Sequence, residues 1–197
     1  MLDIPILRAN AVHEIGHAVV GAVLGMDLVN VAIVDRVRVD GNLQSLGHAR
    51  FRRDPWIRRA KRHYLDVIAM SLAGMAAEDV FLGGHDDGAA GNDGSDLFEA
   101  TNTAMALELT YGMGAKLASY GHPARYPDGN FDPMLLPRVD AVLQEQLDRA
   151  KSILLRHREA CTILADELAV RRELPAQEVL DALEHSAQEN QKNPRSD

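Results

Sequence analysis

The sequence predicts a mainly α-helical domain with a small β-hairpin or sheet after its first helix and a helical tail at its C-terminal end. Hydrophobic residues make up 46% of the 197 residues and aromatic residues only 5%, which indicates helices that pack through aliphatic side chains. Apolar residues recur at helical spacing over most of the chain. Only between Val29 and Phe51 does the apolar period change to two, and Asp40-Gly41 marks a hairpin turn inside this stretch.

The first helix is expected to run from Pro5, which suits a first turn, to about Leu24, with Gly25 as its stop. Two strands follow, from Val29 to Val39 and from Leu43 to Phe51, where apolar residues alternate with polar or small ones. The sheet built from this hairpin is expected to be small.

A second helix is expected to begin at Asp54-Pro55, because aspartate caps helices and proline suits their first turn. It opens with a basic, solvated face over Arg58–His63 and becomes apolar as far as Val80. The stretch Gly83–Ser95 is rich in glycine and aspartate and is expected to be a loop. A helix from Asp96 to about Tyr111 follows it.

Residues 119–137 are expected to form an exposed loop, because they include Pro123, Pro127, Gly129 and Pro133. The helical tail starts at about residue 138 with a long amphipathic helix, continues in helical pattern through Leu168, and ends with a helix that Pro175 opens. We expect residues 1–187 to form one domain and residues 188–197 to be a polar, disordered C-terminus.

Composition and charge exclude several classes of function. The formal net charge is −8, which argues against nucleic acid as a partner. Cys161 is the only cysteine, so the chain has no intramolecular disulfide and no cysteine-based zinc site, and a reducing, cytoplasmic location is expected. Asp3 and Pro5 interrupt any signal-peptide pattern, and Asp27 and Asn30 interrupt the most apolar stretch, so no membrane span is expected.

The first helix carries H-E-x-x-H, formed by His13, Glu14 and His17. Residues four apart in an α-helix lie about 40° apart around the axis, so both imidazoles point the same way and can bind one metal ion. Glu14 lies one step around the helix, where it can serve as a base without binding the metal. Apolar and small residues flank the motif, which favours a buried helix and a metal as the reason for its polar groups.

A catalytic zinc ion usually has three protein ligands, and the sequence leaves the third one open. A metzincin site is excluded, because Val20 and Val23 stand where that class needs glycine and histidine. A thermolysin-like site would use Glu78, whereas a carboxylate at the start of a later helix would be Asp96. The preceding loop holds three rival carboxylates, Asp86, Asp87 and Asp93. A second, weaker candidate site for a cation is formed by His85, Asp86 and Asp87.

Several motifs, in the same order along the chain, resemble those of the FtsH-type zinc metalloproteases, the peptidase half of the membrane AAA proteases. The helix motif is similar to H-E-A-G-H-A, and residues 73–81 resemble G-G-R-A-A-E-E-L-V-F. Residues 96–101 are similar to D-L-x-x-A-T, and residues 111–117 resemble Y-G-M-S-x-K-L. Residues 150–183 look like the helical tail of that family, so the resemblance spans most of the chain.

The resemblance implies a zinc site made by His13, His17 and Asp96, with Glu14 as the catalytic base. It also implies that Glu78 orients a zinc-binding histidine. An edge strand, here within Leu43–Phe51, would bind an extended peptide. The family forms hexameric rings, so a homo-oligomer is expected. Asp96 is favoured on physical grounds as well, because a residue at a helix start is already fixed by the backbone that follows.

The chain also departs from the family pattern. It has no G-x-x-x-x-G-K-[ST] motif, so we expect any ATPase to act from a partner or from a segment outside these 197 residues. The loop before Asp96 is longer than usual, Ser95 replaces asparagine, and Ile15 replaces alanine in the zinc motif. The expected function is a zinc-dependent metalloendopeptidase acting on extended or unfolded polypeptide. The alternative is a catalytically degenerate adaptor or assembly subunit of a protease complex.

Overall fold

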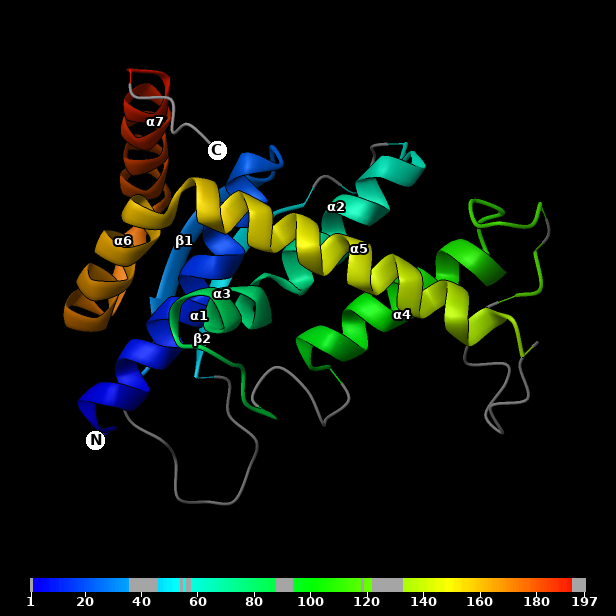
Figure 1. The fold of residues 1–197 in the computed structure, drawn as a ribbon, viewed down its shortest axis with the longest axis horizontal. Coiled ribbons are helices and arrows are strands. Elements are labelled where there is room, and N and C mark those ends of the chain that lie inside the picture. The colour runs from blue at the N-terminus through cyan, green and yellow to red at the C-terminus, as the bar shows by residue number, and fades with distance from the viewer. Residues whose placement is uncertain are drawn as a thin grey trace.

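The structure, a computed structural model, describes residues 2–35, 46–53, 55, 58–87, 94–117, 119–121 and 133–192. Within these residues the chain forms helices and strands in the order α1 (Ile4–Val23), β1 (Asp27–Ile33), β2 (Gly47–Arg52), α2 (Lys61–Ser71), α3 (Ala73–Phe81), α4 (Asp96–Leu109), α5 (Leu135–Arg156), α6 (Arg158–Arg171), β3 (Glu173–Pro175) and α7 (Ala176–Lys192). Figure 1 shows the long α5 running from the α6 side of the molecule to α4. The predicted class, mainly helical with a small sheet, is confirmed.

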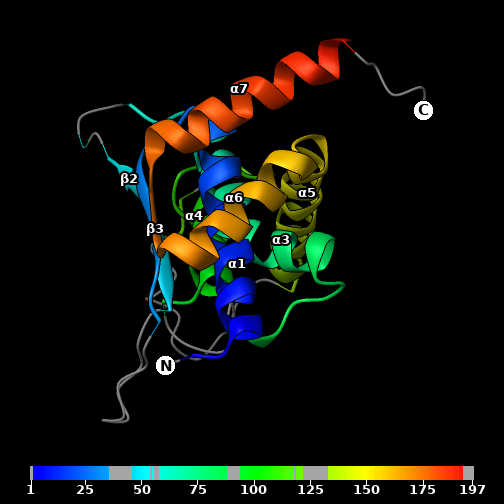
Figure 2. The same ribbon diagram turned by 90° about the vertical axis from the view of Figure 1, so that its left-hand side faces the viewer.

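Helix α1 is the central element of the larger hydrophobic core. Its sequence is apolar around much of its circumference, and such a helix is buried on most sides. Ala18, Val19 and Val20 have no solvent-exposed surface, and Ile15 is 1% exposed. Figure 2 shows the sheet on one side of α1 and the helices α3 and α5 on the other. The polar side chains of Glu14 and His17, in the middle of α1, are therefore buried.

Helix α3 packs unusually close to α1, because both helices present small residues at the contact. A Cβ atom on Gly16 would lie 2.4 Å from the carbonyl oxygen of Ala73 and 2.7 Å from the Cβ of Ala77. Ala73, Ala76 and Ala77 are fully buried. The two backbones therefore approach each other as only glycine and alanine allow.

The three strands form one antiparallel sheet in the order β2-β1-β3. Val31 in the central strand pairs with Ala49 of β2 and with Leu174 of β3. The β1–β2 pairing confirms the predicted hairpin partners within the described residues, whereas residues 36–45, including the Asp40-Gly41 turn, lie outside them. The sequence did not predict β3, because a strand of three residues carries no readable alternation.

A second, smaller hydrophobic cluster joins α2, α4 and α5. Its buried members include Ile68, Leu107 and Leu135. Leu147 of α5 contacts both this cluster and the core around α1. The long amphipathic helix α5 therefore connects the two clusters, as its apolar periodicity predicted.

Two predictions about the second helix are wrong. It begins at Lys61 rather than at Asp54-Pro55, and its N-cap, Ala60, makes no side-chain capping bond. The single helix expected as far as Val80 is divided at Leu72 into α2 and α3. The division has a packing reason, since α2 lies against α4 and α5 while α3 must cross α1.

The tail agrees with the predicted helices but differs in its ends. Helix α5 begins at Leu135 and includes Pro137 in its first turn, so the expected loop is shorter. Helix α7 runs to Lys192, past the point where a disordered terminus was expected, and residues 193–197 lie outside the described residues. In the part of the chain that the structure describes, no helix is both long and apolar enough to cross a membrane.

The close packing of α1 on α3 makes a first prediction. Gly16→Val should lower the free energy of unfolding by about 2–3 kcal/mol, because the added atoms would overlap the α3 backbone. Gly84→Ala is the control: nothing lies within 4 Å of its Cβ position, so its effect should stay within about 0.5 kcal/mol. Urea unfolding followed by circular dichroism measures both. Equal stabilities for the two variants would contradict the packing described.

Candidate metal centre

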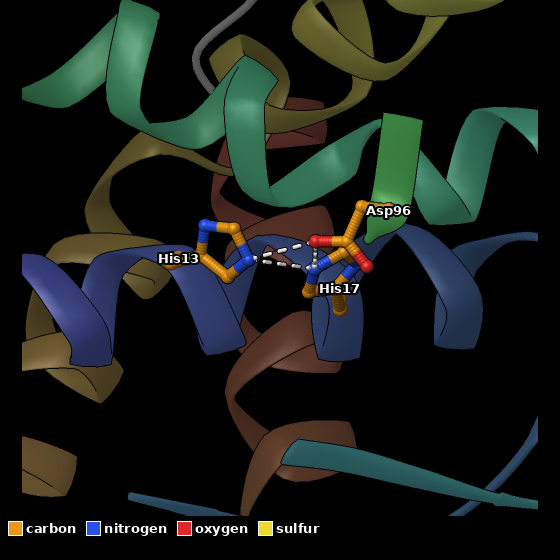
Figure 3. Close-up of side chains that lie close together, drawn as sticks. All are labelled: His13, His17 and Asp96. Carbon is orange, nitrogen blue, oxygen red and sulfur yellow. Dashed lines mark hydrogen bonds and ion pairs between the residues drawn. The ribbon is translucent and has the colours of Figure 1, made fainter. Parts of the chain in front are cut away.

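The side chains of His13, His17 and Asp96 converge on one point between α1 and the first turn of α4. Figure 3 shows the two imidazoles projecting from α1 toward the Asp96 carboxylate. Asp96 Oδ2 lies 3.0 Å from His13 Nε2 and 3.2 Å from His17 Nε2. The two Nε2 atoms lie 3.1 Å from each other. Among the described residues, this is the one group of three or more His, Cys, Asp or Glu side chains arranged to hold a metal ion.

The other ring nitrogen of each histidine is held by the neighbouring helices. His13 Nδ1 lies 2.6 Å from Oε1 of the buried Glu78 on α3. His17 Nδ1 lies 2.7 Å from the backbone carbonyl oxygen of Met70 in the last turn of α2. A carbonyl oxygen only accepts hydrogen bonds, so the His17 Nδ1 atom carries the proton, and neutral His17 has a lone pair on Nε2.

Two Nε2 lone pairs that face each other at this distance repel unless a cation or a proton lies between them. The hydrogen bonds raise the affinity of His13 for a proton: burial lowers its pKa, but the bonds to Asp96 and Glu78 outweigh that effect and raise the pKa to about 10. Burial likewise raises the pKa of Asp96, but its bonds to His13 and His17 prevail and lower it. The group therefore attracts positive charge.

The donor set fits a zinc ion. Zinc bonds to imidazole nitrogen and carboxylate oxygen are about 2.0–2.2 Å long, so the ligand atoms of a tetrahedral site lie about 3.3 Å apart. The three separations, 3.0, 3.1 and 3.2 Å, are close to that value. Two imidazoles and one carboxylate also match the ligand types and number found at catalytic zinc sites.

Asp96 is fixed by the start of α4. Ser95 is the N-cap, and its hydroxyl accepts the backbone N–H of Phe98 at 3.4 Å. The predicted helix start is therefore confirmed, with Ser95 as its N-cap. Asp93, a rival in the sequence, lies outside the described residues. Asp86 and Asp87 are described, and neither is in the group around the two imidazoles.

Glu14 is buried next to the start of β2. It is 8% exposed, and a Cβ atom on Gly47 would lie 2.6 Å from its Oε1 atom, so a larger residue there would displace the carboxylate. Burial raises the pKa of Glu14, and the nearby charges of His17 and His13 oppose that shift. A buried carboxylate with a raised pKa next to two imidazoles is suited to accepting and returning a proton.

Glu78 does not join the group of three but lies behind His13. Its Oε1 atom faces His13 Nδ1, and its Oε2 atom accepts the backbone N–H of Asp86 at 3.1 Å. A Cβ atom on Gly74 would lie 2.4 Å from the His13 ring, so this glycine makes room for the imidazole. These contacts place Glu78 where it can orient a ligand, whereas the thermolysin-like arrangement would need it among the Nε2 atoms.

Several contacts around Glu78 were not predicted from the sequence. Asp79 accepts from His85 Nδ1 at 2.7 Å and from Lys151 Nζ at 2.7 Å, which ties the turn after α3 to α5. His85, considered with Asp86 and Asp87 as a second cation site, is thus engaged by Asp79. The Met70 carbonyl was missed as well, since a backbone acceptor leaves no signal in residue type.

Comparison with known proteins identifies the family. The sequence model of peptidase family M41 matches residues 7–183. The chain is 28% identical to an ATP-dependent zinc metalloprotease FtsH of Lactococcus lactis over 86% of its length, and 29% identical to that of Thermus thermophilus over 87%. It is 25% identical to the mitochondrial inner membrane m-AAA protease component yta12 of Schizosaccharomyces pombe over 85% of its length.

The chain spans only about a quarter of the length of these relatives, namely 25%, 28% and 22% in the same order. The resemblance to FtsH-type metalloproteases predicted from the sequence motifs is confirmed, because the family match covers most of the chain. The chain belongs to peptidase family M41.

Proposed function

We propose that this chain is a zinc-dependent metalloendopeptidase that hydrolyses peptide bonds in extended or unfolded polypeptide. One observation carries the proposal: His13 Nε2, His17 Nε2 and Asp96 Oδ2 lie within 3.2 Å of one another, beside the buried Glu14. Membership of family M41 and the similarity to ATP-dependent zinc metalloproteases support the choice of metal and reaction.

Each residue has a separate role in the proposal. His13, His17 and Asp96 would hold the zinc ion, which when bound would polarise a peptide carbonyl and make a water molecule more acidic. Glu14 accepts the proton of the attacking water and delivers it to the nitrogen of the departing amine. Glu78 and the Met70 carbonyl accept hydrogen bonds from the Nδ1 atoms of the two imidazoles, which orients the rings and would leave both Nε2 lone pairs available to a metal ion.

The substrate strand is proposed to lie along β2. This strand is at the edge of the sheet, and its first residue, Gly47, packs against Glu14. An extended peptide added to an exposed edge gains main-chain hydrogen bonds that do not depend on its sequence. A folded protein cannot offer such a segment, which is why extended or unfolded chains are the proposed substrates.

The activities of the whole relatives come to this chain only as proposals, because it spans about a quarter of their length. Their names describe ATP-dependent proteases, so we propose that an ATPase, in a partner or in a connected domain, delivers substrates to this site. Assembly as a homo-oligomer, a hexamer by family resemblance, and a cytoplasmic location are part of the same proposal.

The alternative, a non-catalytic adaptor, is less well supported. An adaptor has no use for a buried carboxylate next to two imidazoles, since burying such a group costs free energy. Bound zinc and casein cleavage measured in one preparation separate the two functions: an adaptor would show no cleavage even with a full complement of metal.

The metal site predicts about one zinc ion per chain. His13→Ala, His17→Ala and Asp96→Ala should each lose the metal and the peptidase activity, because each removes one of three ligands. Asp87→Ala is the control and should keep both. Elemental analysis after dialysis measures zinc content. Retention of zinc by Asp96→Ala together with its loss by Glu78→Ala would point to a thermolysin-like ligand set instead.

Glu14→Gln should keep the zinc ion and the fold but abolish proteolysis. The amide has the size of the carboxylate, yet it cannot accept a proton from water. Zinc content, thermal unfolding and cleavage of unfolded casein should be compared for the variant and the wild type. Loss of zinc in this variant would show that Glu14 binds the metal and is not the base.

Glu78→Gln should weaken zinc binding by about 10- to 100-fold without removing a ligand, because a neutral amide holds the His13 ring less firmly than a carboxylate. Competition with a chelator measures this affinity. Glu99→Gln, at an exposed carboxylate on α4, is the matched control. An unchanged affinity in Glu78→Gln would mean that Gly74 and the packing of α3 suffice to orient His13.

A further inference from the structure

Strand β2 carries positively charged side chains along its exposed face. Its residues alternate between the two sides of the sheet: Gly47, Ala49 and Phe51 are buried or half-buried, whereas His48, Arg50 and Arg52 are exposed. Arg52 donates to Asp27 at 2.9 Å, an exposed ion pair with the neighbouring strand. Arg50 lies opposite Asn30 and has no acidic partner among the residues that the structure describes.

The positive charge continues beyond the end of the strand. Residues 50–62 contain seven of the 21 lysines and arginines of the chain and a single acidic residue, although the whole chain has a net charge of −8. Five of these basic residues lie exposed after β2, namely Arg53, Arg58, Arg59, Lys61 and Arg62. The overall composition therefore does not account for this local charge.

The outer edge of β2 offers backbone groups in register with these charges. The N–H of Val34 donates to the carbonyl oxygen of Leu46, and such hydrogen-bonded pairs recur at every second position along the β1–β2 ladder. Ala49, opposite Val31, lies at one of the positions between them. Its N–H and C=O therefore point away from β1, to the outer edge of the sheet. A peptide residue bound to Ala49 would place the side chains on either side of it next to His48 and Arg50.

We propose that β2 selects extended substrates with acidic residues at alternate positions, about three and five residues from the cleaved bond. The inference deepens the proposed function, since it rests on the peptide lying along β2. Gly47 marks the reaction centre because it contacts Glu14, and Arg50 and Arg52 lie three and five residues further along the strand. Peptide side chains on the exposed face of the sheet would lie opposite Arg50 and Arg52, and an acidic side chain opposite a basic one stabilises the pair.

The test measures peptide binding by the zinc-loaded Glu14→Gln variant, so that no cleavage is required. Three fluorescent twelve-residue peptides of unstructured sequence would carry two glutamates at alternate positions, two at adjacent positions, or two glutamines. The alternate peptide should bind about 2- to 30-fold more tightly than the glutamine peptide, with the adjacent peptide between them. The gain should shrink at high salt, because exposed charges are screened.

Two further substitutions in that background test the register. Arg50→Glu should remove or reverse the preference for the alternate peptide, and Arg50→Lys should restore most of it. Lys61→Glu makes the same charge change outside the strand and should leave the ratio between alternate and adjacent peptides unchanged. The inference is overturned if the glutamine peptide binds as tightly as the alternate one, or if Lys61→Glu abolishes the preference as fully as Arg50→Glu.

Cleavage assays with the wild type keep the two proposals apart. Hydrolysis of all three peptides at equal rates, with equal affinities, would preserve the peptidase proposal and overturn the selection of acidic residues. Charge-dependent binding without any hydrolysis would support the selection of acidic residues and overturn the peptidase proposal. Hydrolysis that follows the measured affinities would support both.

Discussion

The structure depends on keeping the Nε2 atoms of two imidazoles 3.1 Å apart and facing each other. This arrangement costs free energy in any state in which no positive charge lies between the rings. Both rings are fixed from behind, by Glu78 and by the Met70 carbonyl, and the Asp96 carboxylate in front attracts the positive charge that the arrangement needs. The helices α2, α3 and α4 each contribute one of these three contacts, so most of the fold serves to hold α1 and its two histidines.

That requirement explains features of packing that otherwise look like compromises. Glycines in helices cost about 1 kcal/mol relative to alanine, yet Gly16 and Gly74 let α3 pass close enough to reach His13. The division of α2 from α3 at Leu72 places Met70 in the last turn of α2. Carbonyl groups in the last turn of a helix can accept hydrogen bonds from groups outside that helix. A single continuous helix over residues 61–81 would have placed that carbonyl within its own hydrogen-bond ladder.

The sequence predicted what periodicity and residue type can encode. The spacing of His13 and His17, the stop at Gly25 and the helix beginning at Asp96 were all read correctly. The third ligand was not decided by spacing: Glu78 and Asp96 both stayed open until family resemblance favoured one. The structure separates them by tertiary position, since Glu78 faces Nδ1 and Asp96 faces Nε2. The start of α2, the strand β3 and the Met70 contact depend on long-range packing and backbone groups, which no local pattern reveals.

Three carboxylates around the imidazoles are proposed to have different roles because their surroundings differ. Asp96 bonds to both Nε2 atoms, Glu78 bonds to one Nδ1 atom and a backbone N–H, and Glu14 lies against the backbone of Gly47 with burial raising its pKa. The contact with Gly47 also ties the proposed chemistry to substrate selection. Strand β2, which begins at Gly47 beside Glu14, carries Arg50 on its exposed face. One rigid element would therefore set both the position of the cleaved bond and the side chains accepted beyond it.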